Sequence, residues 1–121
     1  MKNPIPLAGI LGYPVGHSLS PVLHAGWLAD LGLRGAYVPF SVAPAGLGGA
    51  IAAWRALGFM GGNITLPHKE TVCAYLDELD ESARAIGAVN TLVRRGDRLV
   101  GYNSDASGFA THLGAAFPDW L

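Results

Sequence analysis

The order of strand-like and helix-like segments predicts an α/β fold, a three-layer α-β-α sheet that is mostly parallel with an antiparallel edge hairpin. Short apolar runs alternate with helical segments along most of the chain, and this alternation is typical of a parallel sheet. Two strand-like runs then follow each other across Gly96-Asp97, a hairpin-type turn. Half of the 121 residues are hydrophobic and 14% are charged, as in one packed domain, which we place over 1–121.

The amino-terminal part is predicted to form three strands separated by two helices. Ser20-Pro21 begins the first helix, because serine caps a helix and proline fits its first position. Pro39 predicts an edge position for the second strand, since proline cannot donate to a sheet ladder. Pro44 begins the second helix and Gly58 ends it. The predicted strands are 7–12, 36–42 and 59–64, and the predicted helices are 20–31 and 44–57.

The carboxyl-terminal part is predicted to hold helices 68–79 and 81–86, the hairpin strands 89–93 and 99–102, and a final helix capped at Asp105. In such sheets ligands bind beyond the carboxyl ends of the strands. Polar clusters follow three strand ends here, at 18–20, 63–69 and 103–105. Their convergence on one rim predicts a small-molecule site.

The densest cluster is Asn63-Ile64-Thr65-Leu66-Pro67-His68-Lys69. Pro67 is predicted to begin a helix, which puts Lys69 in its first turn. The positive helix end would lower the pKa of Lys69 towards the range useful for proton transfer. A carboxylate at Asp105 would raise that pKa and fix the direction of the lysine. On its own the heptapeptide fits a surface loop with a solvated lysine better, and contact between Lys69 and Asp105 stays open.

Two further polar features have ordinary structural alternatives. Ser18 and Ser20 precede a helix amino terminus, where hydroxyl and N–H groups suit a carboxylate or phosphate. Equally, Ser20 is a helix cap and Ser18 a loop residue. Asn90 begins a strand and can hydrogen-bond a hydroxyl or carbonyl, although an isolated asparagine more often caps a turn.

Composition and spacing exclude several classes of function. The net charge of −1 gives no footprint for nucleic acid or an anionic membrane, and no apolar run approaches the ~18 residues of a membrane helix. Cys73 is the only cysteine and no signal peptide is evident, which suits the cytoplasm. The scattered histidines indicate no metal site. Glycines at 46–49 begin like a dinucleotide fingerprint, but Ile51 replaces the third glycine and Pro44 places the run inside a helix, so we reject it.

Four motifs, taken in order, resemble the N-terminal, substrate-binding domain of shikimate dehydrogenase. Ser104 stands where threonine is usual in that family, and Ala25 where an asparagine often follows the histidine. The family continues into a dinucleotide-binding domain, for which the 121 residues leave no room. The matching motifs are 12–21 with His24, 63–69, 87–92, and 101–105 with Gly108.

The resemblance implies reduction of 3-dehydroshikimate to shikimate with NADPH, in aromatic amino-acid biosynthesis. It implies that Lys69 is the catalytic acid/base, paired with Asp105, and protonates the alkoxide that hydride transfer creates. The other implied substrate contacts are Ser18 and Ser20 to the carboxylate, and Thr65, Asn90 and Asp105 to ring hydroxyls.

Because the NADP(H)-binding domain is missing from these residues, we expect no cofactor-binding residue in the chain and no turnover by the chain alone. The alternative is a stand-alone module that binds shikimate or quinate without catalysis. We also expect the surface left by the missing domain to pair as a homodimer. The apolar side chains concerned are Phe109, Leu113, Phe117 and Trp120.

Overall fold

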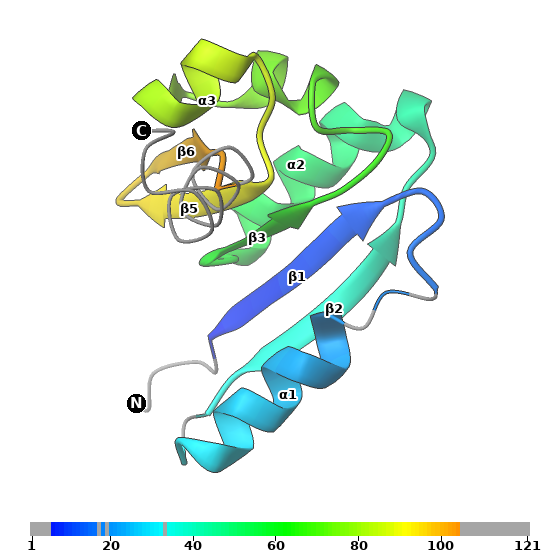
Figure 1. Ribbon diagram of the computed structural model, residues 1–121, viewed down its shortest axis with the longest axis vertical. Helices are drawn as coiled ribbons and strands as arrows, with labels where there is room; N and C mark the ends of the chain where they lie inside the picture. The colour runs from blue at the N-terminus through cyan, green and yellow to red at the C-terminus, as the bar shows by residue number, and fades with distance from the viewer. Residues whose placement is uncertain (1–5, 17, 19, 33, 105–121) are drawn as a thin grey trace, which may run out of the picture.

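The computed structural model describes residues 6–16, 18, 20–32 and 34–104, without the side chains of Ser20, Trp27 and Leu28. The described strands form a six-stranded sheet in the order β2-β1-β3-β5-β6-β4, and Figure 1 shows β2, β1, β3, β5 and β6 in this order. The strands are β1 (Leu7–Gly12), β2 (Ala36–Ser41), β3 (Gly61–Ile64), β4 (Glu78–Leu79), β5 (Thr91–Arg95) and β6 (Arg98–Tyr102). The helices are α1 (Ser20–Asp30), α2 (Leu47–Leu57) and α3 (Glu81–Ile86), with 3-10 turns η1 (Pro44–Gly46) and η2 (Thr71–Tyr75).

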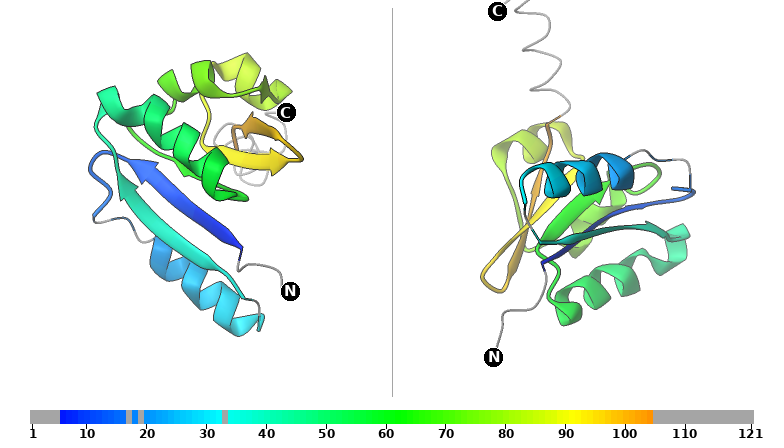
Figure 2. Two further views of the ribbon diagram at one scale, coloured as in Figure 1. Left: turned by 180° about the vertical axis from the view of Figure 1, so that it is seen from behind. Right: turned by 90° about the horizontal axis from the view of Figure 1, so that it is seen from below.

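The predicted mixed sheet is confirmed. β1 pairs in parallel with β2 and β3, whereas β3, β5 and β6 pair in antiparallel fashion. β2 lies at the sheet edge, as its proline predicts. The chain passes from β1 to β2 and then back to β3, so two right-handed crossovers place α1 and α2 on opposite faces. Figure 2 shows this three-layer arrangement.

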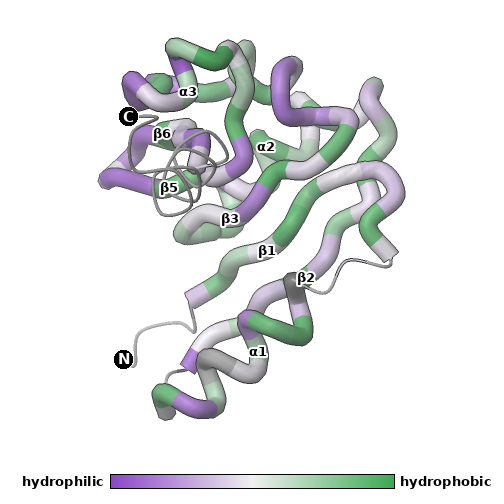
Figure 3. Tube along the Cα trace, viewed as in Figure 1, coloured by the Kyte–Doolittle hydropathy of each residue, from purple (hydrophilic) through white to green (hydrophobic). Residues whose placement is uncertain are grey.

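The main core lies between the sheet and α2. Leu11 of β1, Ile64 of β3 and Leu92 of β5 are almost fully buried beside Ile51 and Trp54 of α2. Figure 3 shows that β1, which lies between β2 and β3, is mainly apolar. Four consecutive residues of β1 are buried, which explains why this strand appears in the sequence as a continuous apolar run.

Glycines allow the tight contacts of the central strands. The Cβ of a larger residue at Gly62 would meet the carbonyl oxygen of Gly9 at 2.2 Å and the Trp54 ring at 2.9 Å. A Cβ at Gly61 would meet the carbonyl oxygen of Leu92 at 2.1 Å, and Gly61 has a φ of +153°. The glycine pair therefore lets β3 fit between its neighbours while Trp54 packs flat against Phe59, with ring centroids 5.1 Å apart.

The predicted helix 68–79 is wrong. The structure has the 3-10 turn η2 followed by β4, which pairs in parallel with β6 at the far edge of the sheet. The side chain of Asp77 accepts the Leu99 N–H at 2.7 Å, and the Asp77 N–H donates to the Leu99 carbonyl at 3.0 Å. These hydrogen bonds to β6 satisfy polar groups of the segment, which in a helix would need hydrogen-bond partners within the helix itself. The predicted final helix from Asp105 lies outside the described residues.

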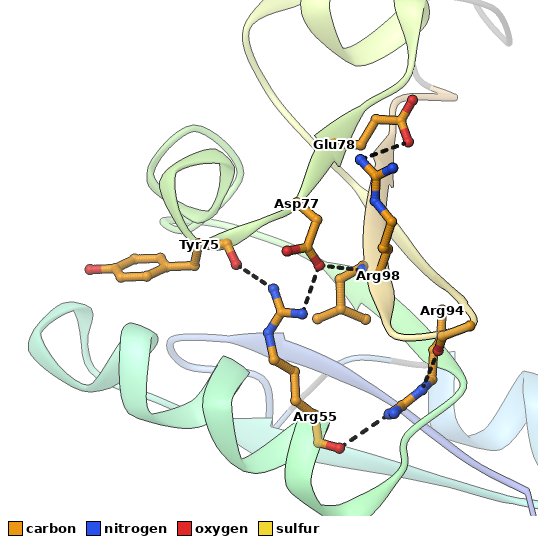
Figure 4. A network of polar contacts seen from close by, with 8 residues as sticks. Arg55, Tyr75, Asp77, Glu78, Arg94 and Arg98 are labelled. Carbon is orange, nitrogen blue, oxygen red and sulfur yellow. Dashed lines mark hydrogen bonds and ion pairs between the residues drawn. The ribbon is translucent and has the colours of Figure 1, made fainter.

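Asp77 is also the centre of a polar network that joins α2 to the edge of the sheet (Figure 4). Arg55 of α2 donates to the Asp77 carboxylate at 2.7 Å and to the Tyr75 carbonyl at 3.0 Å. Arg94 of β5 in turn donates to the Arg55 carbonyl at 3.1 Å. The Leu99 N–H and the Arg55 guanidinium favour the charged carboxylate and hold the pKa of Asp77 below its ordinary value.

Within the described part of the chain, no helix combines the length and the apolar character that crossing a membrane requires.

The lowered pKa of Asp77 predicts an acid-sensitive contribution to stability. The folded state prefers the carboxylate, so the contribution is present at neutral pH and is lost as the pH falls below about 4 through the folded pKa. Asp77→Asn should lower the free energy of unfolding at pH 7 and converge with the wild type near pH 2.5. Urea unfolding from pH 7 to pH 2.5 measures this difference. A constant difference over that range would contradict the role of charge.

The tight approach at Gly61 predicts a large cost for a methyl group. Gly61→Ala should lower the free energy of unfolding by about 2–4 kcal/mol, because it adds a strained φ to an overpacked contact. Gly49, in the exposed face of α2, has no atom within 4 Å of the position of a Cβ. As the matched control, Gly49→Ala should raise stability by about 0.5–1 kcal/mol. Equal effects of the two substitutions in urea unfolding would contradict the packing argument.

Candidate small-molecule site

Four strand ends meet at the carboxyl edge of the sheet, which is the side on which the parallel strands β1 and β3 finish. Gly12 and Ile64 end the parallel strands β1 and β3, and Tyr102 ends β6 at the same edge. β5 runs in the opposite direction, so its first residue Thr91 lies here, paired with Tyr102 and with Asn63. The residues that follow or precede these ends come from the predicted polar clusters. The predicted convergence of the described clusters on one edge is therefore correct.

The loop that carries Ser18 is tied to the loop that carries Thr65. The Tyr13 N–H donates to the Leu66 carbonyl and the Thr65 N–H donates to the Leu11 carbonyl, both at 3.0 Å. A Cβ at Gly12 would lie 2.3 Å from Cγ2 of Thr65, so only glycine admits this side chain beside the end of β1. The half-buried Ser18 follows in the same loop, with its N–H bonded to the Val15 carbonyl at 3.1 Å.

Two predicted site residues cannot be placed. Ser20 begins α1, as predicted, but its side chain is outside the description. Asp105 lies outside the described residues altogether, so its pairing with Lys69 stays a prediction.

Lys69 lies in a turn between β3 and η2 and is half-buried. The predicted helix start at Pro67 is wrong, because η2 begins only at Thr71. The helix dipole therefore provides no argument about the charge of this lysine. Its main chain is fixed instead by the Val89 N–H, which donates to the Lys69 carbonyl at 2.7 Å, and by the thiol of Cys73 at 3.8 Å.

The Cys73 thiol supports this turn from its buried side. Burial raises the pKa of the thiol, which keeps it protonated and able to donate to the carbonyls of Lys69 and Gly87. The single cysteine is thus part of the support of the turn.

Asn90 holds the end of β6 through its side chain. Its Nδ2 donates to Oγ of Ser104 at 3.0 Å, and its Oδ1 accepts the Ser104 N–H at 3.2 Å. Oδ1 also accepts the Thr91 hydroxyl at 2.9 Å. The capping role that the sequence left open for Asn90 is therefore present, and it acts on a residue fourteen positions away.

Asn103 was not predicted as a site residue, yet it is buried, with 4% of its surface exposed. Its Nδ2 donates to the Ala88 carbonyl at 3.0 Å, and its N–H donates to the hydroxyl of Ser82 at 3.1 Å. Segment 88–90 thus bonds to Lys69 on one side and to 103–104 on the other. A polar tripeptide directly after a buried strand was the signal that could have identified Asn103 and Ser104.

The side chain of Asn63 forms hydrogen bonds that link β3 to neighbouring parts of the sheet. Its Oδ1 accepts the hydroxyl of Tyr37 at 2.7 Å, and its Nδ2 donates to the Asn90 carbonyl at 3.4 Å. The ring of His24 stacks on Tyr37 at 3.9 Å between centroids. His24 is half-buried, as expected for a structural histidine.

His68 anchors the heptapeptide to the end of β2. Its ring is fully buried, and Nε2 lies 2.6 Å from the Val42 carbonyl oxygen. A carbonyl only accepts, so Nε2 carries the proton. Nδ1 is buried and has no hydrogen-bond partner among the residues that the structure describes. His68 therefore fixes the turn that precedes Lys69 and does not line the site.

Lys69 and Ala88 are among the residues that line a hollow of ≈ 360 Å³. A larger and mainly apolar cavity of ≈ 470 Å³ opens where β1, β2 and β3 begin, at the opposite edge, and none of the predicted site residues lines it. We favour the hollow at Lys69, because it is lined by a predicted site residue and lies at the edge of the sheet where the polar strand ends meet. In the described ranges no group of three or more histidine, cysteine or acidic side chains could hold a metal ion.

The glycine run 46–49 lies in η1 and α2, inside helical structure. Its rejection as a phosphate-binding loop is therefore supported, since such a loop has to stand between a strand and the start of a helix.

Comparison with known proteins gives one consistent result. Residues 10–92 match the family described as the shikimate dehydrogenase substrate binding domain. A shikimate dehydrogenase (NADP(+)) of Rhodospirillum rubrum is 55% identical over 115 residues, covering 94% of this chain and 41% of the relative. The chain therefore spans less than half the length of that relative.

Solved structures agree with this result. The shikimate 5-dehydrogenase of Thermus thermophilus, in complex with NADP(H) and shikimate, has a TM-score of 0.84 at 43% identity, covering 93% of this chain and 42% of that protein. The ligand-free 5-ketofructose reductase of a Gluconobacter strain has a TM-score of 0.87 at 32% identity, covering 94% of this chain and 41% of that protein.

The contact between Gly12 and Thr65 predicts a coupled pair of substitutions. Gly12→Ala should lower the free energy of unfolding by about 1–3 kcal/mol, since the new methyl overlaps Cγ2 of Thr65. Thr65→Ser removes Cγ2 and keeps the hydroxyl, so in the Gly12→Ala background it should restore part of the loss. Urea unfolding of both single variants and the double variant measures the coupling. Additive losses would show that the two loops do not depend on this contact.

Proposed function

We propose that this chain, which belongs to the family of shikimate dehydrogenase substrate-binding domains, forms the substrate-binding part of an NADP-dependent shikimate dehydrogenase. The reaction proposed is reduction of 3-dehydroshikimate to shikimate. The observation that carries the proposal is the placement of Lys69 and Asn90 at one edge, joined through Val89. The names of the Rhodospirillum and Thermus proteins support the same reaction.

The site suits a hydroxylated carboxylic acid. We assign the substrate carboxylate to Ser18, which precedes α1, and to Ser20, which is its first residue. We assign the ring hydroxyls to Thr65 and Asn90, with Asp105 as a third contact. The backbone hydrogen bonds between the Ser18 loop and the Thr65 loop support this assignment. They hold the proposed carboxylate contacts near the proposed hydroxyl contacts of one small substrate.

The chemical step needs a proton at the carbonyl oxygen that becomes a hydroxyl. We assign this proton to Nζ of Lys69, which gives it to the developing alkoxide and takes it back in the reverse direction. Asp105 is proposed to orient Lys69 as its charged partner. The half-buried position of Lys69 beside a hollow of ≈ 360 Å³ supports this role, because a ligand there displaces water from the ammonium group.

The described residues do not fit a dinucleotide. Their one glycine-rich run lies in helical structure, and we derive no step through the cofactor. We propose that NADP(H) binds to a separate domain outside these 121 residues, and that the chain alone does not turn over. The chain covers 41% of the Rhodospirillum relative, which leaves room for such a domain there.

The Gluconobacter neighbour shows that this fold also occurs in a protein named for a neutral keto sugar. Substrate choice is therefore the finer part of the proposal. A carboxylate-binding loop at Ser18 favours an acid over a neutral sugar. The cytoplasm remains the expected location, from the single cysteine.

The proposal predicts a specific binding pattern. Titration of the ¹⁵N-labelled chain with shikimate should shift the amide signals of Thr65, Lys69 and Asn90, with a Kd in the millimolar range. Lys69→Met should weaken binding by about 10–100-fold, the effect of removing a charged hydrogen-bond donor. Arg98→Gln is the matched control, because it removes a cation at the opposite end of β6 and should leave the Kd unchanged.

Three outcomes would contradict parts of the proposal. Micromolar binding of shikimate would favour the stand-alone binding module. Oxidation of NADPH by the chain with 3-dehydroshikimate would show that no further domain is required. Stronger binding of 5-ketofructose than of shikimate would reject the acid as the substrate.

A further inference from the structure

Ser104 is an exposed residue two positions after the end of β6, and its hydroxyl and its N–H both bond to one side chain. The Ser104 hydroxyl accepts from Nδ2 of Asn90 at 3.0 Å, and the Ser104 N–H donates to Oδ1 of Asn90 at 3.2 Å. The two bonds run in opposite directions across the carboxamide. They therefore fix which end of the carboxamide carries the oxygen and which carries the nitrogen.

Other bonds fix the backbone on both sides of this pair. The Asn90 N–H donates to the Tyr102 carbonyl at 3.0 Å, and the Asn90 carbonyl accepts the Ile64 N–H at 2.9 Å. The buried side chain of Asn103 holds the Ala88 carbonyl. With the backbone held, the remaining freedom of Asn90 is rotation of its side chain, and Ser104 restricts that rotation.

We propose that Ser104 is a positioning residue, which orients the Asn90 carboxamide for a hydroxyl of the bound ligand and acts on ligand affinity only through Asn90. The inference rests on the proposed function, since it deepens the role assigned there to Asn90. A carboxamide that turns by half a revolution presents an acceptor where a donor was. The affinity for a hydroxylated ligand therefore depends on holding one orientation.

The chain offers a graded pair of substitutions at this exposed position. Ser104→Ala removes the hydroxyl acceptor and leaves the N–H, so one of the two bonds to Asn90 is lost. Ser104→Thr keeps both bonds and adds a methyl group in a solvent-exposed place. Neither substitution opens a buried cavity, so thermal unfolding of both variants should stay close to that of the wild type.

The experiment follows the Asn90 side chain and the ligand separately. In ¹⁵N-labelled protein, hydrogen exchange at the Asn90 side-chain amide should be faster in Ser104→Ala than in the wild type and unchanged in Ser104→Thr. The Kd for shikimate, from the same titration, should rise about 3–10-fold in Ser104→Ala, as expected for one net hydrogen bond. Ser104→Thr should restore the wild-type Kd.

A double variant separates action through Asn90 from direct contact. Asn90→Ala weakens binding by removing the carboxamide, and adding Ser104→Ala should then change the Kd no further. An additional loss in the double variant would assign Ser104 a contact of its own with the ligand and overturn the proposal.

The remaining outcomes distinguish the two proposals. If the wild type binds shikimate and Ser104→Ala binds equally well, the positioning role is wrong and the proposed function stands. If the wild type shows no binding with a saturating ligand series, the proposed function is wrong for this chain, and the positioning role falls with it. Unchanged side-chain exchange in Ser104→Ala would reject the positioning role whatever the affinities show.

Discussion

The hydrogen bond from the Val89 N–H to the Lys69 carbonyl, 2.7 Å long, is the constraint on which the site depends. It lies next to the Ile64 N–H to Asn90 carbonyl bond, which extends the ladder between β3 and β5, and it joins the turn after β3 to the residue before Asn90. Through it, the turn after β3 is held against the segment that enters β5. Asn90 then reaches β6 through its own N–H and side chain. Lys69 and the residues after Tyr102 thus owe their relative positions to the sheet, which is stiffer than a loop closed only by side chains.

The elements around this constraint follow from local signals. Ser20-Pro21, Gly58 and the Gly96-Asp97 turn each set a boundary that the structure reproduces, because caps and turns are decided by neighbouring residues. The prediction of a helix over 68–79 was wrong because the structure of that segment depends on a residue distant in the sequence. The conformation of this segment depends on the Asp77 side chain, which accepts a hydrogen bond from the Leu99 N–H, 22 residues away. A pattern of apolar spacing contains no information about such a partner, and β4 was missed with it.

The same division applies to the site. The residue types were predictable, since Thr65, Lys69 and Asn90 stand at strand ends, where α/β sheets place their ligands. Their pairings were not. Asn90 meets Ser104 because β5 is inserted antiparallel between β3 and β6, and this register is a property of the whole sheet. Ser104 belongs to the polar cluster 103–105, but its contact with Asn90 is visible only in the structure.

The location of Lys69 in a turn changes the electrostatic argument for its chemistry. In the first turn of a helix the lysine would face the positive end of a dipole. In the structure Lys69 lies in a turn before η2 (Thr71–Tyr75), so this argument does not apply to it. Asp105, which directly follows Ser104, is the carboxylate that the sequence offers. Hydrogen bonds join 103–104 to 88–90, and a further hydrogen bond joins Val89 to Lys69, so Ser104 and the turn of Lys69 are held by the same segment.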